Sequence, residues 1–236
     1  MGLTLEVCVD TFAGLVEAIA GGADRIELCA ALALGGLTPS AGLMAMAASC
    51  PVPVMVMIRP RAGDFVWTEA EVGMMEADIA ATRAAGLAGV VLGASLPDGR
   101  LDVPVLKRLV AAAAGLDLTL HRAIDLAPDM GQALEAAIRV GFRRILTSGG
   151  EKTAEAGVAR IAALVTQSAG RISIMPGSGV SPPNARMLKG LGIAEIHASC
   201  STLIAMSGKV VEMGFGPAMV RQTSTEQVLA LRRALA

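Results

Sequence analysis

One pattern recurs along the chain and constrains its fold more than any other: an alanine-rich segment of helical length, a glycine, and then a short aliphatic run. A glycine directly after a helix adopts the left-handed backbone that other residues resist. Glycines of this kind stand at Gly22, Gly86, Gly115, Gly141, Gly170 and Gly192. The last four lie 22 to 29 residues apart, the length of one strand plus one helix. The chain therefore alternates strands with helices.

The aliphatic runs predict eight strands, at residues 3–9, 25–29, 54–59, 89–93, 116–121, 144–147, 172–175 and 194–198. Helices are predicted at 11–20, 41–48, 69–84, 103–113, 130–140, 154–168 and 182–191, with a closing helix at about 225–235. Ser181, followed by two prolines, fits the cap and first turn of the 182–191 helix.

Eight strands, each followed by a helix, predict an α/β fold of the TIM-type (β/α)8 barrel class, with a single domain over residues 1–236. A doubly wound open sheet is the alternative. No Gly-x-Gly-x-x-Gly follows the first strand, which disfavours the dinucleotide-binding form of that fold. No organic cofactor is therefore implied.

The composition describes a core of small aliphatic side chains, with 53% hydrophobic but only 2% aromatic residues and no tyrosine. The net charge is -1, without a basic stripe, so nucleic acid is not expected as a partner. No secretory signal is visible at the amino terminus, and apolar runs such as 52–58 are too short to span a bilayer. We expect a cytoplasmic chain without membrane partners, in which the four cysteines stay reduced.

Most of the predicted strands end in polar residues, and a barrel gathers its functional groups at the carboxyl ends of its strands. Glu6 and Cys8 lie two positions apart on the first strand and so share a face, and Glu27 and Cys29 repeat this arrangement on the second. Because burying unpaired charge is costly, such groups are expected to face a cleft where chemistry occurs. The candidate catalytic residues are Glu6, Glu27, Arg59, His121, Asp125 and His197.

A second group of strand ends is suited to binding an anion. Backbone N–H groups of a glycine-rich turn before a capped helix can cradle a phosphate, and arginines can clamp a carboxylate or phosphate. The candidate anion-binding residues are Arg122, Ser148, Gly149, Gly177, Ser178 and Gly179. Two structural roles are equally compatible with these residues: a tight turn that needs positive φ, and arginines that pair with Glu6, Glu27 or Asp125.

Cys8 and Cys29 are the candidate metal ligands. They end adjacent predicted strands, about 4.8 Å apart, and two reduced thiols at that distance can hold a soft ion such as Cu(I). There is no Cys-x-x-Cys pair and no quartet of ligands, which disfavours a structural zinc site. Simple burial in the core is the alternative, because free cysteine is among the most buried residue types.

Seven ordered motifs resemble those of the copper homeostasis protein CutC family. They are Leu-Glu-Val-Cys-Val-Asp (5–10), Gly-Gly-Ala-Asp-Arg-Ile-Glu-Leu-Cys (21–29), Gly-Gly-Leu-Thr-Pro-Ser (35–40), Ile-Arg-Pro-Arg-Ala-Gly-Asp-Phe (58–65), His-Arg-Ala-Ile-Asp (121–125), Leu-Thr-Ser-Gly-Gly (146–150) and Met-Pro-Gly-Ser-Gly-Val (175–180). The similarity runs from about Leu3 to Ser201 and then fades. The resemblance implies a βα barrel, a cytoplasmic location, a homodimer and a role in intracellular copper handling, with Cys8 and Cys29 as candidate Cu(I) ligands.

Two functions follow from these observations. The first is a copper-handling protein that binds Cu(I) through Cys8 and Cys29, as the resemblance implies. The second is a barrel enzyme acting on a small phosphorylated or carboxylated metabolite. There, Arg59 and the 177–179 turn would hold the anion, and His121 with Glu6 or Glu27 would move protons.

Overall fold

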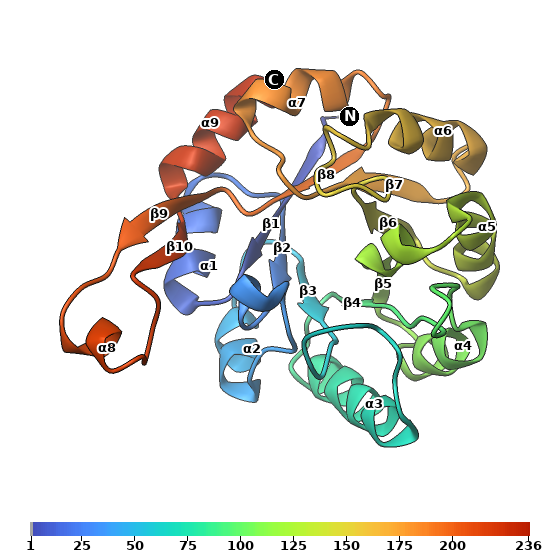
Figure 1. Cartoon of the computed structure of the whole chain (residues 1–236), viewed down its shortest axis with the longest axis horizontal. Coiled ribbons are helices and arrows are strands. Elements are labelled where there is room, and N and C mark those ends of the chain that lie inside the picture. Colours follow the sequence, from blue (N-terminus) through green and yellow to red (C-terminus); the bar gives the residue numbers. More distant parts are fainter. Residues whose placement is uncertain (1) are drawn as a thin grey trace.

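A computed structural model describes residues 2–236 as a barrel of parallel strands surrounded by helices (Figure 1). The barrel strands are β1 (Thr4–Val9), β2 (Arg25–Leu28), β3 (Val54–Met57), β4 (Gly89–Leu92), β5 (Asp117–Leu120), β6 (Arg144–Thr147), β7 (Ser173–Pro176) and β8 (Glu195–Ala198). They form one eight-stranded sheet in the order β7-β6-β5-β4-β3-β2-β1-β8, and every pairing is parallel. The single-domain TIM-type (β/α)8 fold that the sequence predicts is confirmed.

Helices follow the strands and cover the outside of the sheet. They are α1 (Phe12–Ala20), α2 (Ala41–Ala47), α3 (Glu69–Ala84), α4 (Val103–Ala112), α5 (Met130–Val140), α6 (Val158–Ser168), α7 (Pro182–Lys189) and α9 (Thr225–Leu235), with short 3-10 turns η1 (Leu32–Leu34) and η2 (Arg122–Leu126). Side chains cap many of them; Ser181 and Asn184 form the capping box at the predicted start of α7. Within residues 2–236, no helix is long and apolar enough to cross a membrane.

The sheet closes almost completely. β8 pairs with β1 in register, but no ladder of backbone hydrogen bonds joins β7 to β8 in the described chain. A cavity of about 270 Å³ lies at this seam, and residues 170, 172–174 and 192–194 contribute to its lining. The barrel is therefore a curled sheet with two free edges at the seam.

Every predicted strand is present, with ends that differ by at most two residues. The helices at 69–84, 130–140 and 225–235 have the predicted bounds. The largest difference concerns α6, which begins at Val158 where the sequence predicts 154. Residues before Val158 form turns, and a Cβ on Gly157 would overlap the backbone oxygen of Ser148. The chain must pass too close to the end of β6 there for a helix to begin earlier.

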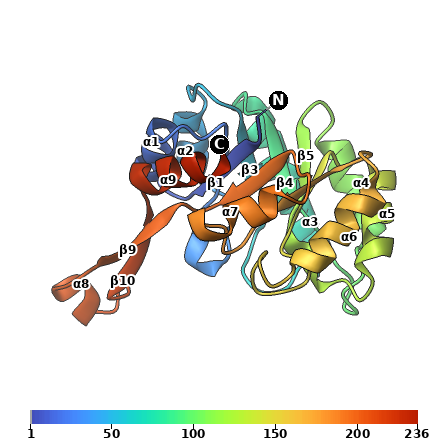
Figure 2. The same ribbon diagram turned by 90° about the horizontal axis from the view of Figure 1, so that it is seen from above.

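Residues 201–223, for which the sequence predicts no element, form an arm. Its parts are β9 (Ser201–Ala205), the single turn α8 (Lys209–Glu212) and β10 (Met219–Thr223), and the two strands pair antiparallel. The arm projects from the barrel in both views (Figures 1 and 2). Its exposed apolar side chains are Leu203, Ile204, Met206, Val210, Met213, Phe215 and Met219. Apolar surface of this extent is typical of an interaction site.

Candidate functional site

The interior of the barrel carries a chain of ion pairs where other barrels have layers of aliphatic side chains. Arg25 Nε lies 2.5 Å from Glu6 Oε2, and the same guanidinium binds Glu195 through Nη2. Glu195 Oε2 also accepts from Arg144 Nε at 2.9 Å, and Arg144 Nη2 lies 2.8 Å from Asp117 Oδ2. Charges alternate in sign along this chain, so each buried ion has a partner that offsets its desolvation.

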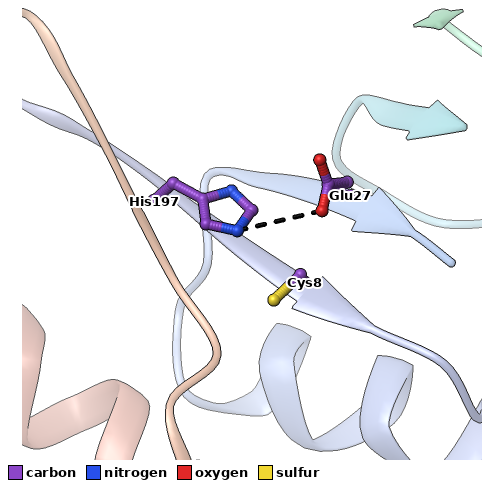
Figure 3. Close-up of side chains that lie close together, drawn as sticks. All are labelled: Cys8, Glu27 and His197. Carbon is purple, nitrogen blue, oxygen red and sulfur yellow. Dashed lines mark ion pairs between the residues drawn. The ribbon is translucent and has the colours of Figure 1, made fainter. Parts of the chain in front are cut away.

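His197, on β8, extends this series of ion pairs toward the carboxyl ends of the strands. Its Nδ1 lies 2.8 Å from Oε1 of Glu6, and its Nε2 lies 3.8 Å from Oε2 of Glu27 (Figure 3). Burial lowers the pKa of His197, but Glu27, Cys8 and Glu6 together raise it well above 6.5. Because the imidazolium is favoured at neutral pH, His197 adds a positive charge between two carboxylates.

The two glutamates respond to their surroundings in opposite ways. Burial would raise the pKa of Glu6, but the hydrogen bond with His197 and the charge of Arg25 lower it to about 2. Burial raises the pKa of Glu27, and the neighbouring Glu6 adds to this effect against the attraction of His197. Oε1 of Glu27 is buried without a hydrogen-bond partner. Glu27 is thus poised to accept a proton or a ligand.

Three potential metal ligands converge at the ends of β1, β2 and β8. One ligand atom each from Cys8, Glu27 and His197 lies within 4.8 Å of the others, and all three side chains are buried (Figure 3). In-register pairing of Cys8 with Glu27 and of Glu6 with His197 produces this arrangement. Cys29 lies next to the cluster, with Sγ 3.5 Å from Oε2 of Glu27, and burial followed by Glu27 raises its thiol pKa well above 9.0.

The second histidine, His121, is in a different environment on the far side of the barrel mouth. Its Nδ1 accepts the backbone N–H of Ala123 at 3.1 Å, which leaves the proton of the neutral ring on Nε2. That Nε2 is buried without a partner. Burial and the charge of Arg59 lower the pKa of His121 to about 3. His121 is therefore a neutral hydrogen-bond donor.

Arg59 follows β3 and has no carboxylate partner among the described residues. Its guanidinium donates to three backbone carbonyls, of Leu34 at 3.0 Å, Gly36 at 3.1 Å and Gly63 at 2.9 Å. Its Nε is buried and unpartnered, and its Cζ lies 5.0 Å from the centre of the Phe65 ring. A positive charge is thus held in place by peptide carbonyls and the Phe65 ring.

The carboxylate of Asp125 occupies the glycine-rich turn after β6. Its oxygens accept from the backbone N–H groups of Ser148 and Gly150 and from the hydroxyl of Thr147. Arg122 Nε donates to it at 2.7 Å, while Arg122 Nη2 donates to the Ser148 hydroxyl at 2.6 Å. Gly149 N–H is bound to Thr147 Oγ1. This region therefore shows the pairing of arginine with carboxylate that the sequence left open.

A cavity of about 980 Å³ opens at the barrel mouth and extends under the arm. Of the predicted site residues, it is lined by Cys8, Glu27, Arg59, His121, Arg122, Ser178, Gly179 and His197. Glu6, Cys29, Asp125, Ser148, Gly149 and Gly177 do not line it. Glu6 is fully buried behind His197. Glu6 and Glu27 contact His197, whereas His121 lies apart from them, and proton transfer by His121 with either glutamate stays a prediction.

The 177–179 turn has the predicted backbone and borders the cavity. Ser178 and Gly179 have φ of 76° and 72°, and the Ser178 hydroxyl donates to the carbonyl of Lys152 at 2.7 Å. Gly177 is explained by space, because a Cβ there would lie 2.5 Å from Cδ1 of Leu146. Positive φ at the turn is thus confirmed, and anion binding by these residues stays a prediction.

Comparison with known proteins gives one consistent result. The CutC family model matches residues 3–202. The chain belongs to the CutC family. A CutC family protein of Sinorhizobium medicae is 56% identical over 235 residues, covering 99% of this chain and 96% of that protein. A CutC family protein of Caulobacter vibrioides is 52% identical, covering 98% and 96%.

Solved structures give the same family. The CutC protein of Streptococcus agalactiae, whose name refers to copper homeostasis, has a TM-score of 0.80 and 32% identity, covering 84% of this chain and 98% of that one. A thiamine phosphate pyrophosphorylase from Pyrococcus furiosus, at 15% identity and a TM-score of 0.61, shares the fold alone. All site residues described above lie inside the CutC family match, which ends at the second residue of β9. Most of the arm and α9 lie beyond it.

Sequence reasoning missed the interior ion pairs of the CutC chain. Arg25 lies two positions before Glu27, Glu195 two positions before His197, and Asp117 four positions before His121. The alternation of strand side chains places each pair on one face, so these residues point inward with the candidate site. Applying that alternation to every charged residue of the strands would have identified them.

Proposed function

We propose that the chain binds Cu(I) at the cluster of Cys8, Glu27 and His197 and takes part in copper handling. The observation that supports this is the convergence of a thiol, an imidazole and a carboxylate within 4.8 Å at the barrel mouth. Thiolate sulfur is a ligand that selects Cu(I), and imidazole also suits copper. The family name is consistent with the same metal.

The surroundings of the cluster fit a metal ion. Histidine ligands usually donate their second ring N–H to a carboxylate, and Glu6 accepts from His197 Nδ1 at 2.8 Å while Nε2 faces the cluster. Oε1 of Glu27 has no partner, as expected of an atom whose partner is a ligand. Cys29, the second thiol that the sequence suggests, contacts Glu27 but lies outside the group of mutually close ligand atoms.

Binding of Cu(I) must release protons. His197 has to lose the proton that its raised pKa favours, and thiols bind as thiolates. The cytoplasm, where thiols stay reduced, suits such a site, and Cys8, Cys29, Cys50 and Cys200 are all free. We therefore place the function in the cytoplasm.

The test is a titration of the reduced protein with Cu(I) in competition with a chromophoric chelator. Cys8→Ala and His197→Gln should each weaken the affinity by about tenfold or more, since each removes a ligand. Cys50→Ala is the matched control, because Cys50 is half-buried and lies outside the cluster. Unchanged affinity in the Cys8→Ala/Cys29→Ala double variant would contradict the proposal.

A second function is favoured by one observation: Glu27 and His197 form a titratable pair that borders a cavity large enough for a metabolite. Both groups have raised pKa values, so each holds its proton more tightly than a free side chain and the pair is suited to exchanging a proton with a bound molecule. This supports a barrel enzyme acting on a small phosphorylated or carboxylated metabolite. A broad panel of such metabolites, screened by thermal shift and turnover, tests it; the absence of any response would count against it.

The homodimer that the family resemblance implies is also a proposal. The exposed apolar side chains of the arm support it, with Phe215 80% exposed at its outer end. Sedimentation of the full chain and of Phe215→Ser measures it. We expect a dimer that weakens in the variant, and a monomer at all concentrations would contradict the proposal.

A further inference from the structure

We infer that Arg59 and His121 form an oxyanion-binding subsite, which takes the carboxylate or phosphate group of a small molecule in the cavity at the barrel mouth. Both side chains line that cavity, and they follow the ends of β3 and β5. This subsite deepens the second proposed function by supplying its binding group, and it does not depend on Cu(I).

Arg59 has hydrogen-bond donors that no described residue uses. A guanidinium carries five N–H donors, and the three bonds to Leu34, Gly36 and Gly63 account for both Nη1 hydrogens and one of Nη2. The Nε–H and one Nη2–H remain, on neighbouring nitrogens of a planar group. Two parallel N–H donors of this kind are what arginine offers to a carboxylate or phosphate.

The charge of Arg59 also calls for an anionic partner. Arg59 is 6% exposed, and a buried cation without a counter-ion is costly. The two other deeply buried arginines, Arg25 and Arg144, each bind two carboxylates. Among the described residues, the hydrogen bonds of the Arg59 guanidinium all go to backbone carbonyls, which fix its position without neutralising it. An anionic ligand would supply the missing charge.

His121, which is 2% exposed, offers a second buried hydrogen-bond donor. The Ala123 N–H bound to Nδ1 makes Nε2 the donor, and this atom has no partner. A neutral imidazole donor beside a guanidinium adds a directed hydrogen bond to an oxyanion without requiring protonation. The nearby positive charge of Arg59 keeps the ring in that neutral form.

Phe65 brings the two donors into one environment. Its ring centre lies 4.5 Å from that of His121 and 5.0 Å from Arg59 Cζ, and the residue is only half-buried. It shields both donors from water, which strengthens any charged hydrogen bond made there. Phe65 lies on the segment between β3 and α3 and lines the same cavity as the two donors.

The test measures saturable binding of simple anions by thermal shift and calorimetry. Inorganic phosphate and acetate are the two probes, with chloride added to keep ionic strength constant, and the tighter of the two assigns the group. Arg59→Met should abolish saturable binding of the preferred anion. Arg59→Lys should weaken it by about tenfold, because a point charge replaces the two-donor edge.

Arg61→Met is the matched control. Arg61 lies two residues away, is partly exposed and pairs with Asp64 and Glu71, so its removal should leave the affinity unchanged. His121→Phe should weaken binding by about tenfold, and His121→Gln, which keeps a donor, by less. Should Arg59→Met fail to fold, Arg59→Lys and the two His121 variants decide the matter by themselves.

Two outcomes would overturn the inference: no saturable binding of either anion to the wild-type chain, or an equal loss in Arg61→Met. The titration is repeated on Cys8→Ala/Cys29→Ala, where retained anion binding separates the subsite from the copper proposal. Saturable phosphate binding without turnover of any metabolite would support the subsite and contradict the proposed enzymatic function.

Discussion

The two histidines of the chain lie at equivalent places in two regions of the barrel mouth, and their chemistry is opposite. His197 ends β8 beside two buried carboxylates, which raise its pKa well above 6.5. His121 follows β5 beside a guanidinium and a phenyl ring, and its pKa falls to about 3. The first is a cation at neutral pH, and the second is a neutral donor.

A position at a strand end therefore brings a side chain to the barrel mouth but does not define its chemical role. Both side chains are more than nine-tenths buried, so desolvation disfavours the charged ring in each. The neighbours decide the outcome. Glu6 and Glu27 reverse the effect of burial at His197, whereas Arg59 reinforces it at His121.

The largest effect is expected from breaking the ion pairs behind His197. Arg25→Met leaves Glu6 and Glu195 without their shared partner and should lower the free energy of unfolding by about 3–5 kcal/mol. Urea unfolding at pH 7 measures it. Arg108→Met is the control, because its pairs with Glu69 and Glu76 are exposed and should contribute too little to resolve. Equal effects of the two variants would show that the buried ion pairs do not stabilise this region.

The next effect is a loss of stability in acid that involves His121 and not His197. Since folding lowers the pKa of His121, the unfolded chain takes up the proton first as pH falls below 6.5, and stability is lost toward pH 3. Between pH 7 and pH 5 this amounts to about 2 kcal/mol. His121→Phe should remove that loss, as measured by urea midpoints at the two pH values. The same acid sensitivity in His121→Phe would mean that His121 is not the group responsible.

Each histidine stands against a glycine, and this gives a matched pair of substitutions. A Cβ on Gly93 would overlap Cε1 of His121, so Gly93→Ala should cost about 1–2 kcal/mol through overpacking against a fixed ring. Gly177→Ala meets mainly the mobile end of Leu146 and should cost about 1 kcal/mol or less. Thermal unfolding compares them, and a larger cost at Gly177 would reverse the order of rigidity assigned to the two regions.

The last effect concerns His197 in base. Because folding raises its pKa, the stabilisation is complete below pH 6.5 and is lost as pH rises through the folded value; the raised pKa of Glu27 contributes with the same sign. The metal-free chain should therefore lose up to about 1.4 kcal/mol per pH unit above neutrality through His197 alone. His197→Gln should flatten this slope in urea unfolding from pH 7 to pH 9. An unchanged slope would assign it to other groups.

Most of the barrel could be predicted because each element carries its own signal. The capping box at Thr68 marks the start of the helix of residues 69–84 in the sequence. Gly141 likewise marks the end of the helix of residues 130–140. The arm carries no such signal. Its strands have mixed polarity, and only the pairing of Ser201–Ala205 with Met219–Thr223 defines them.

The site could be predicted as a location but not as a set of contacts. Strand alternation places Cys8, Glu27 and His197 at one mouth, yet the register between β1, β2 and β8 decides which side chains touch. Pairing of Glu6 with His197 is such a case, because the two residues are 191 positions apart. The absence of a carboxylate at Arg59 depends on every neighbour at once, so the sequence could not reveal it.

The missing ladder between β7 and β8 has a consequence for motion. The facing edges of these strands have backbone N–H and C=O groups that no partner strand protects, while Glu195 of β8 is tied to Arg144 of β6 by a side chain alone. Local fluctuations of the wall should begin at this joint. Deuterium should therefore replace the amide hydrogens that point into the gap between β7 and β8 sooner than those of β2 and β3, which have neighbours on both sides.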